Sequence, residues 1–181
     1  MQKLASFVLK IIGWKISGEI PRDVKKVILI QAPHTSLWDF VIGRIVFWHY
    51  AYPIKLLIKK EAFNWPFGGF MKALGGIPVN RKKNEKMVDA VARLVNESDK
   101  IVLVITPEGT RPLVEKWKRG FYYIALKAKV PIALGWIDYP DKRGGIGPII
   151  YPSGNFEKDF KEIEDFYRGF RGKHPERFNL S

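Results

Sequence analysis

The strongest constraint on the fold is the run "IVLVI" at residues 101–105, where aliphatic side chains follow one another without a polar residue. Continuous apolar runs of this length are typical of strands that are buried on both faces of a sheet. A second run of this kind, "VILIQA", covers residues 27–32. Sheets buried on both faces are usually parallel and carry helices on each side, so the two runs favour an α/β fold.

The segments around these runs alternate between helical and strand-like patterns. Residues 84–97 are the clearest helix, because Met87, Val91 and Leu94 recur at helical spacing and form one apolar face. We expect further helices at 36–49 and 119–129, a short one after Pro66, and amphipathic helices at 1–15 and 155–170. Further strands are expected at 54–59, 77–80, 131–137 and 147–152. With no repeat or linker, residues 1–181 are expected to form a single α/β domain whose mostly parallel central sheet is flanked by helices.

The charge is strongly positive and unevenly placed. The formal net charge is +13, and the basic excess is concentrated in residues 1–26, 55–86 and 107–129. This distribution predicts an anionic partner, such as a lipid headgroup, an acidic carrier protein, a phosphorylated substrate or nucleic acid. The chain has no cysteine, which excludes disulfides and thiol catalysis and fits a cytoplasmic location.

Membrane contact is expected at the surface of a bilayer. No apolar run is long enough for a transmembrane helix, and the N-terminus lacks the features of a signal peptide. The helix at residues 1–15 carries aromatic and aliphatic residues among lysines, so it either lies in a membrane interface or packs on the core. Aromatic residues with lysines nearby also mark a second segment, where we favour a membrane-facing role over burial. Its four aromatic residues are Phe63, Trp65, Phe67 and Phe70.

His34 and Asp39 lie where the strand at 27–32 gives way to the helix at 36–49. An imidazole titrates near neutral pH and suits a general base, and such a base is usually oriented by a carboxylate. Residues five apart differ by about 140° around a regular helix, so the two meet only if His34 lies in the turn before the helix. Pro33 favours that placement. The alternative is that Asp39 favours the helix N-terminus while His34 simply packs, and the pair alone leaves both interpretations open.

Polar residues also follow two other expected strands. Ser36 beside His34 suggests a nucleophile, but its place at a helix start and the absence of a G-x-S-x-G pattern favour an N-cap. After the strand at 101–105, the sequence "TPEGTR" places Glu108, Thr110 and Arg111 around a turn allowed by Gly109. Arginine suits bidentate phosphate recognition. The alternative for this segment is a surface turn with an internal Glu–Arg pair.

Together these residues resemble the glycerophospholipid acyltransferases, the family that includes the 1-acylglycerol-3-phosphate acyltransferases. Its hallmark is a histidine and an aspartate separated by four residues, the HxxxxD motif, matched here by His34 and Asp39. Its proline-glutamate-glycine-threonine-arginine run is matched in full at 107–111, and its glycine-to-arginine block loosely at 76–81. A strand start of apolar residue, proline and apolar residue is matched at 130–132, so order and spacing agree over roughly residues 13–150.

The resemblance implies a glycerol-phosphate-acyltransferase-like fold and a specific reaction. A fatty acyl group would pass from a thioester, acyl-CoA or acyl carrier protein, to the free hydroxyl of a lysophospholipid such as lysophosphatidate. His34 would remove the hydroxyl proton, Asp39 would hold the imidazole, and the oxygen would attack the thioester directly. No metal or cofactor is implied, and the enzyme would be associated peripherally with an anionic membrane surface.

The resemblance also assigns the acceptor site. Arg81 and Arg111 would bind the phosphate of the acceptor, while Glu108, Gly109 and Thr110 would shape that site. An alternative keeps the same chemistry but uses another acceptor, a lyso-aminolipid or a glycolipid precursor. An alternative of another class is a non-catalytic basic protein that binds membrane or nucleic acid. The sequence shows neither zinc-finger spacing nor an RNP-like aromatic run, so no nucleic-acid partner is expected.

Overall fold

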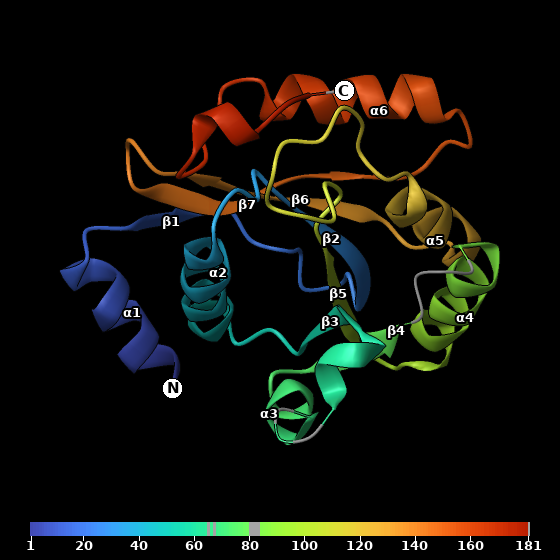
Figure 1. The fold of residues 1–181 in the computed structure, drawn as a ribbon, viewed down its shortest axis with the longest axis horizontal. Helices are drawn as coiled ribbons and strands as arrows, with labels where there is room; N and C mark the ends of the chain where they lie inside the picture. Colours follow the sequence, from blue (N-terminus) through green and yellow to red (C-terminus); the bar gives the residue numbers. More distant parts are fainter. Residues whose placement is uncertain (65, 67, 80–83, 181) are drawn as a thin grey trace.

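The computed structural model describes residues 1–64, 66, 68–79 and 84–180. They form one seven-stranded sheet with the strand order β1-β7-β6-β2-β5-β3-β4 (Figure 1). The strands are β1 (Lys15–Ser17), β2 (Lys26–Ala32), β3 (Ile54–Lys59), β4 (Gly76–Val79), β5 (Ile101–Ile105), β6 (Ile132–Asp138) and β7 (Arg143–Ile150). Every pair of neighbours is parallel except β6 and β7, so the expected α/β fold with a mostly parallel sheet is confirmed.

The helices cover both faces of the sheet. They are α1 (Gln2–Ile11), α2 (Leu37–Tyr50), α3 (Gly68–Ala73), α4 (Asn84–Glu97), α5 (Gly120–Ala128) and α6 (Phe156–Tyr167), with 3-10 turns η1 (Lys60–Phe63) and η2 (Pro175–Arg177). Helices α1 and α2 lie on one side of the sheet, and α6 lies on the other side together with α4 and α5 (Figure 1). Within the described part of the chain, no helix is both long and apolar enough to cross a membrane.

The two apolar runs occupy neighbouring strands, as expected of the most buried part of a parallel sheet. Strands β2 and β5 pair from Lys26↔Ile101 to Ile30↔Ile105. Successive side chains of a strand point to opposite faces, so the runs supply both cores. Ile28 and Leu103 pack towards α4, α5 and α6, while Leu29 and Val102 pack in the cluster that contains Phe47 of α2.

Helix α2 begins at Leu37 with Ser36 as its N-cap, which confirms the prediction of an N-cap. The Ser36 side chain accepts a hydrogen bond from the backbone N–H of Trp38, and Asp39 accepts one from the backbone N–H of Ser36. This reciprocal arrangement satisfies backbone donors that the first turn of a helix leaves free. It fixes where the chain turns from β2 into α2, directly after His34.

The bounds of some elements differ from those expected. Strand β1 was not predicted, because only three residues pair with β7 at the edge of the sheet and they show no apolar pattern. Strand β7 begins at Arg143 rather than 147, since its glycine-rich first half pairs with β6 through backbone groups. Helices α1 and α6 end at Ile11 and Tyr167, which is earlier than the expected residues 15 and 170.

Candidate active site

His34 and Asp39 lie together at the C-terminal edge of the sheet. His34 occupies the turn between β2 and α2, and Asp39 lies in the first turn of α2. The distance from His34 Nδ1 to Asp39 Oδ2 is 3.4 Å. The imidazole is 20% exposed and the carboxylate 1% exposed. Because Asp39 faces Nδ1, the other ring nitrogen, Nε2, is left to take a proton from a substrate.

The Asp39 carboxylate is held from several directions. Its Oδ2 accepts hydrogen bonds from the backbone N–H groups of Thr35 and Ser36, at 2.7 and 2.8 Å. Its Oδ1 accepts one from the hydroxyl of Tyr139 at 2.7 Å. Burial by itself raises the pKa of Asp39, but the hydrogen bonds with His34, Tyr139 and Ser36 outweigh it and keep the pKa below its ordinary value. Asp39 is therefore a fixed anion beside the imidazole.

Tyr139 is a site residue that sequence reasoning missed. It follows the end of β6 and contacts Asp39 across 100 positions of sequence. Burial raises the pKa of Tyr139, and the hydrogen bond to Asp39 raises it further. The hydroxyl therefore keeps its proton and donates a hydrogen bond to Asp39. Strand β6 pairs with β2 up to Ala32↔Trp136, so the residues after β6 lie near those after β2. The rule that sites lie beyond the C-terminal ends of parallel strands was therefore the signal for Tyr139.

Glu108 lies beneath the histidine turn. Its side chain is 1% exposed, and its Oε1 accepts a hydrogen bond from the backbone N–H of His34 at 2.7 Å. Oε2 is buried and has no hydrogen-bond partner among the described residues. Burial raises the pKa of Glu108 to about 8, against the effect of the His34 hydrogen bond, and the charge of Asp39 adds to the rise. The geometry gives Glu108 a role in supporting His34 rather than a place on the wall of the substrate cavity.

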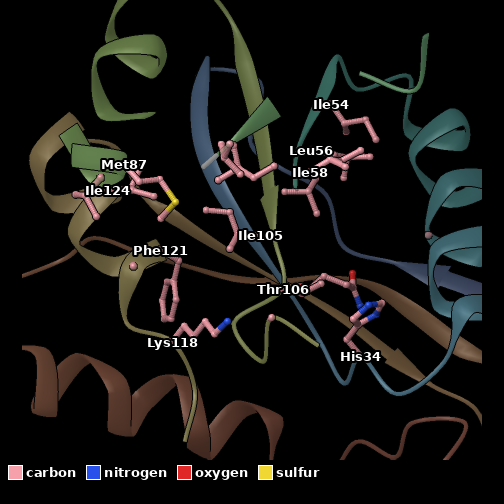
Figure 2. Close-up of a pocket in the computed structure, with 18 of the residues that line it drawn as sticks. His34, Ile54, Leu56, Ile58, Met87, Ile105, Thr106, Lys118, Phe121 and Ile124 are labelled. Carbon is pink, nitrogen blue, oxygen red and sulfur yellow. The ribbon is translucent and has the colours of Figure 1, made fainter. Parts of the chain in front are cut away.

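A cavity of about 1110 Å³ opens at His34 and Asp39. Its walls are mostly apolar and come from both sides of the sheet. Figure 2 shows Ile54, Leu56 and Ile58 on one side and Met87, Phe121 and Ile124 on the other, with Thr106 near the centre and His34 below Ile58. Ligand pockets of about 300–1,000 Å³ are usual, so this cavity is large enough for a lipid-like substrate.

Among the described residues, the cations that line the cavity do not include the predicted Arg111. Arg44, Lys118, Arg119 and Lys127 line it. Two of these four are paired with carboxylates, Arg119 with Glu157 and Lys127 with Asp89.

The predicted acceptor-site residues take different positions. Gly109 lines the cavity and has a φ of 70°, which suits the turn after β5. Thr110 and Arg111 are exposed, and neither is among the described residues that line the cavity. Arg81 lies outside the described residues. No ion pair between Glu108 and Arg111 is seen in the described part of the chain, because the carboxyl is turned inward to His34.

The predicted membrane-facing residues are placed in part. Phe70 on α3 is 59% exposed, and Phe63 is half-buried, while Trp65 and Phe67 lie outside the described residues. Another exposed apolar surface lies on α1 and α2, which pack against each other and share a hydrogen bond between Ser6 and His49. We call it the α1–α2 surface, and its residues are Leu4, Phe7, Ile11, Leu37, Trp38, Val41 and Trp48.

Among the described residues, no group of three or more histidine, aspartate or glutamate side chains is placed to hold a metal ion. The chemistry that the site offers is proton transfer by an imidazole oriented by a carboxylate, at the mouth of an apolar cavity. That combination suits the removal of a proton from the hydroxyl of a substrate that carries an alkyl chain.

A family profile and a solved structure are similar to this chain. The profile of a family described as "Acyltransferase" matches residues 14–137, which include His34, Asp39 and the 107–111 run. Among solved structures, the chain is similar to the 1-acyl-sn-glycerophosphate (LPA) acyltransferase PlsC from Thermotoga maritima, with a TM-score of 0.64 and 17% identity. The match covers 93% of this chain and 76% of that one. A search of curated proteins found no match.

Proposed function

Because this chain belongs to the acyltransferase family, we propose that it moves a fatty acyl group from acyl-CoA or acyl carrier protein to the free hydroxyl of a lysophospholipid such as lysophosphatidate. The observation that carries the proposal is the 3.4 Å contact between His34 and Asp39 at the mouth of an apolar cavity of about 1110 Å³. A base next to a space for an alkyl chain is what transfer to a lipid hydroxyl requires.

His34 is the general base. Nε2 takes the proton of the acceptor hydroxyl as its oxygen bonds to the thioester carbonyl carbon. The carbon–sulfur bond then breaks, and the proton passes from His34 to the leaving thiol, so the imidazole returns neutral. Asp39 holds the ring and stabilises its charged form, and such base assistance is worth ~10²–10⁴-fold in rate. The hydrogen bonds from Thr35, Ser36 and Tyr139 keep Asp39 ionised throughout.

The acceptor's headgroup meets cations at the cavity. Lys118 lines the cavity next to Gly109, and no carboxylate pairs with it among the described residues, so it is available to an acceptor phosphate. The exposed position of Arg111, away from the lining, favours a second candidate: the same reaction on a lyso-aminolipid or glycolipid precursor that needs fewer phosphate contacts.

The α1–α2 surface brings the enzyme to its acceptor. Its aromatic and aliphatic side chains enter the interface of a bilayer, while Lys3 and Lys10 on α1 meet anionic headgroups. Each basic residue near an anionic surface adds about 1 kcal/mol of attraction. The net charge of +13 acts in the same direction.

Thioester consumption with a panel of acceptors tests the proposal. Free thiol release from palmitoyl-CoA is measured with lysophosphatidate, a lyso-aminolipid and a glycolipid precursor in turn. Turnover that depends on lysophosphatidate and falls at least ~10²-fold in His34→Gln supports the proposed reaction. Preference for another acceptor selects the second candidate, and a folded His34→Gln protein with full activity rules out the base.

A further inference from the structure

The cavity has two apolar arms on opposite faces of the sheet. Val104 and Ile105 are consecutive in β5 and both line the cavity, yet Val104 belongs to the core cluster beside α2 and Ile105 packs against the cluster beside α4 and α5. Consecutive strand residues face opposite sides, so the cavity reaches both. The α2 arm is lined by Phe40, Gly43, Phe47, Ile54, Leu56 and Ile58. The α5 arm is lined by Met87, Val88, Ile105, Gly120, Phe121 and Ile124.

The arms join at the reacting residues. His34, Thr106 and Gly109, which lie at the C-terminal ends of β2 and β5, line the same cavity. In Figure 2, His34 and Thr106 lie beside each other, below the side chains of Ile54, Leu56 and Ile58. Two apolar arms that meet at a base match a product with two alkyl chains whose new ester lies at their junction.

The α2 arm is continuous with the α1–α2 surface. Phe40 lines the arm and is also 40% exposed, and Leu37, three residues earlier on the same face of α2 and part of the α1–α2 surface, is 66% exposed. A chain that leaves a bilayer beside α2 therefore reaches this arm along the apolar side chains of Leu37 and Phe40. The substrate that resides in the bilayer is the monoacyl acceptor.

The α5 arm is rimmed by positive charge. Arg119 and Lys127 line its part of the cavity, and their partner carboxylates, Glu157 and Asp89, are exposed to water. A thioester carrier of the coenzyme A type bears several phosphates, so its charge complements this rim. The acyl chain attached to that carrier then extends between α4 and α5.

We propose that the two arms bind two different alkyl chains at once: the α2 arm takes the chain of a monoacyl lipid acceptor, and the α5 arm takes the chain of the thioester donor. This inference rests on the proposed acyl transfer. It adds that the acceptor's own chain is held inside the protein during the reaction. Each arm therefore sets the chain preference of a single substrate.

Two helical glycines provide a matched pair of variants. A Cβ on Gly43 of α2 has no atom within 4 Å, and a Cβ on Gly120 of α5 approaches the methyl of Met87 at 4.0 Å. Neither residue has a positive φ, so larger side chains fit the helix at both positions. Gly43→Leu narrows the α2 arm, and Gly120→Leu narrows the α5 arm.

Titration calorimetry with two unreactive probes, one for each arm, measures the affinity of each arm separately. One probe is 1-oleoyl lysophosphatidate without donor, and the other is a thioether analogue of palmitoyl-CoA without acceptor. Each methylene kept out of an apolar site costs about fourfold in affinity. We expect Gly43→Leu to weaken lysophosphatidate about tenfold and to leave the analogue within about twofold, with the reverse for Gly120→Leu.

Gly43→Ala and Gly120→Ala carry the same test with one methyl group, in case a leucine variant fails to fold. They should show the same crossed pattern at about fourfold or less. A variant that weakens both probes equally, weakens neither, or reverses the pattern overturns the assignment of the arms. The binding split does not need turnover. Absence of thioester consumption by the starting protein would therefore refute the proposed function separately.

Discussion

The buried position of Glu108 predicts how the free energy of unfolding depends on pH. Replacing it with glutamine keeps an oxygen that accepts the hydrogen bond from the His34 N–H, seen at 2.7 Å, but removes the ability to ionise. The side chain is 1% exposed, so the charged form has little access to water. Burial is the largest influence and raises the pKa of Glu108 from an ordinary 4.5 to about 8, and the charge of Asp39 contributes. Tyr167 is fully buried, and burial together with the charge of Glu108 raises the pKa of the Tyr167 phenol.

The sign of the effect follows from proton linkage. An acid with a higher pKa in the folded state binds more protons folded than unfolded, so the free energy of unfolding falls as the pH rises. Each pH unit costs about 1.4 kcal/mol between the two pKa values. Between pH 4.5 and about 8 the folded carboxyl stays protonated while the unfolded one ionises, so the free energy of unfolding falls by about 5 kcal/mol across this range and by about 3 kcal/mol up to pH 7.

Urea unfolding at several pH values checks this. Below about pH 4.5 the starting protein and Glu108→Gln should have similar free energies of unfolding, because both side chains are neutral. Above it the glutamine variant should become the more stable, by about 3 kcal/mol at pH 7. Glu115→Gln, at an exposed position, is the control and should not produce this divergence. Stability curves for the starting protein and Glu108→Gln that stay parallel between pH 5 and 8 would refute the reasoning.

Three further predictions concern the other features of the site. Tyr139→Phe keeps the ring beside Trp14 but removes a hydrogen bond to a charged group, so kcat should fall about tenfold or more with KM unchanged in steady-state kinetics. Lys118→Ala should raise the KM for lysophosphatidate more than Arg111→Ala does, because Lys118 lines the cavity; equal effects would contradict that placement. Trp38→Ser should weaken sedimentation with vesicles that contain anionic phosphatidylglycerol about tenfold, whereas the exposed Tyr151→Ser, outside the α1–α2 surface, should not.

The sequence predicted what local pattern controls. The runs at 27–32 and 101–105 are apolar throughout, and they became adjacent central strands. His34 and Asp39 are close in sequence, so one turn and one helix start decide their geometry, and the prediction that they can meet agrees with the structure. Ser36 was identified as a cap by the same local reasoning.

Long-range contacts were beyond that reasoning. Tyr139 reaches Asp39 across 100 positions, and only the pairing of β6 with β2 brings it there. The family resemblance placed Glu108 in the acceptor phosphate site together with Thr110 and Arg111. The chain instead turns its carboxyl inward to the His34 backbone, 74 positions away, while those neighbours face solvent. Arg81 lies outside the described residues, so its role in binding the acceptor phosphate stays a prediction.

Asp39 begins a helix and orients a base with the same carboxylate. Its Oδ2 accepts the backbone N–H of Ser36, which closes the first turn of α2, and also faces His34. Opening of that single turn would therefore release the imidazole even if the sheet beneath stayed folded. On heating, activity should disappear at a lower temperature than the cooperative melting of the domain, and it should return at once on cooling.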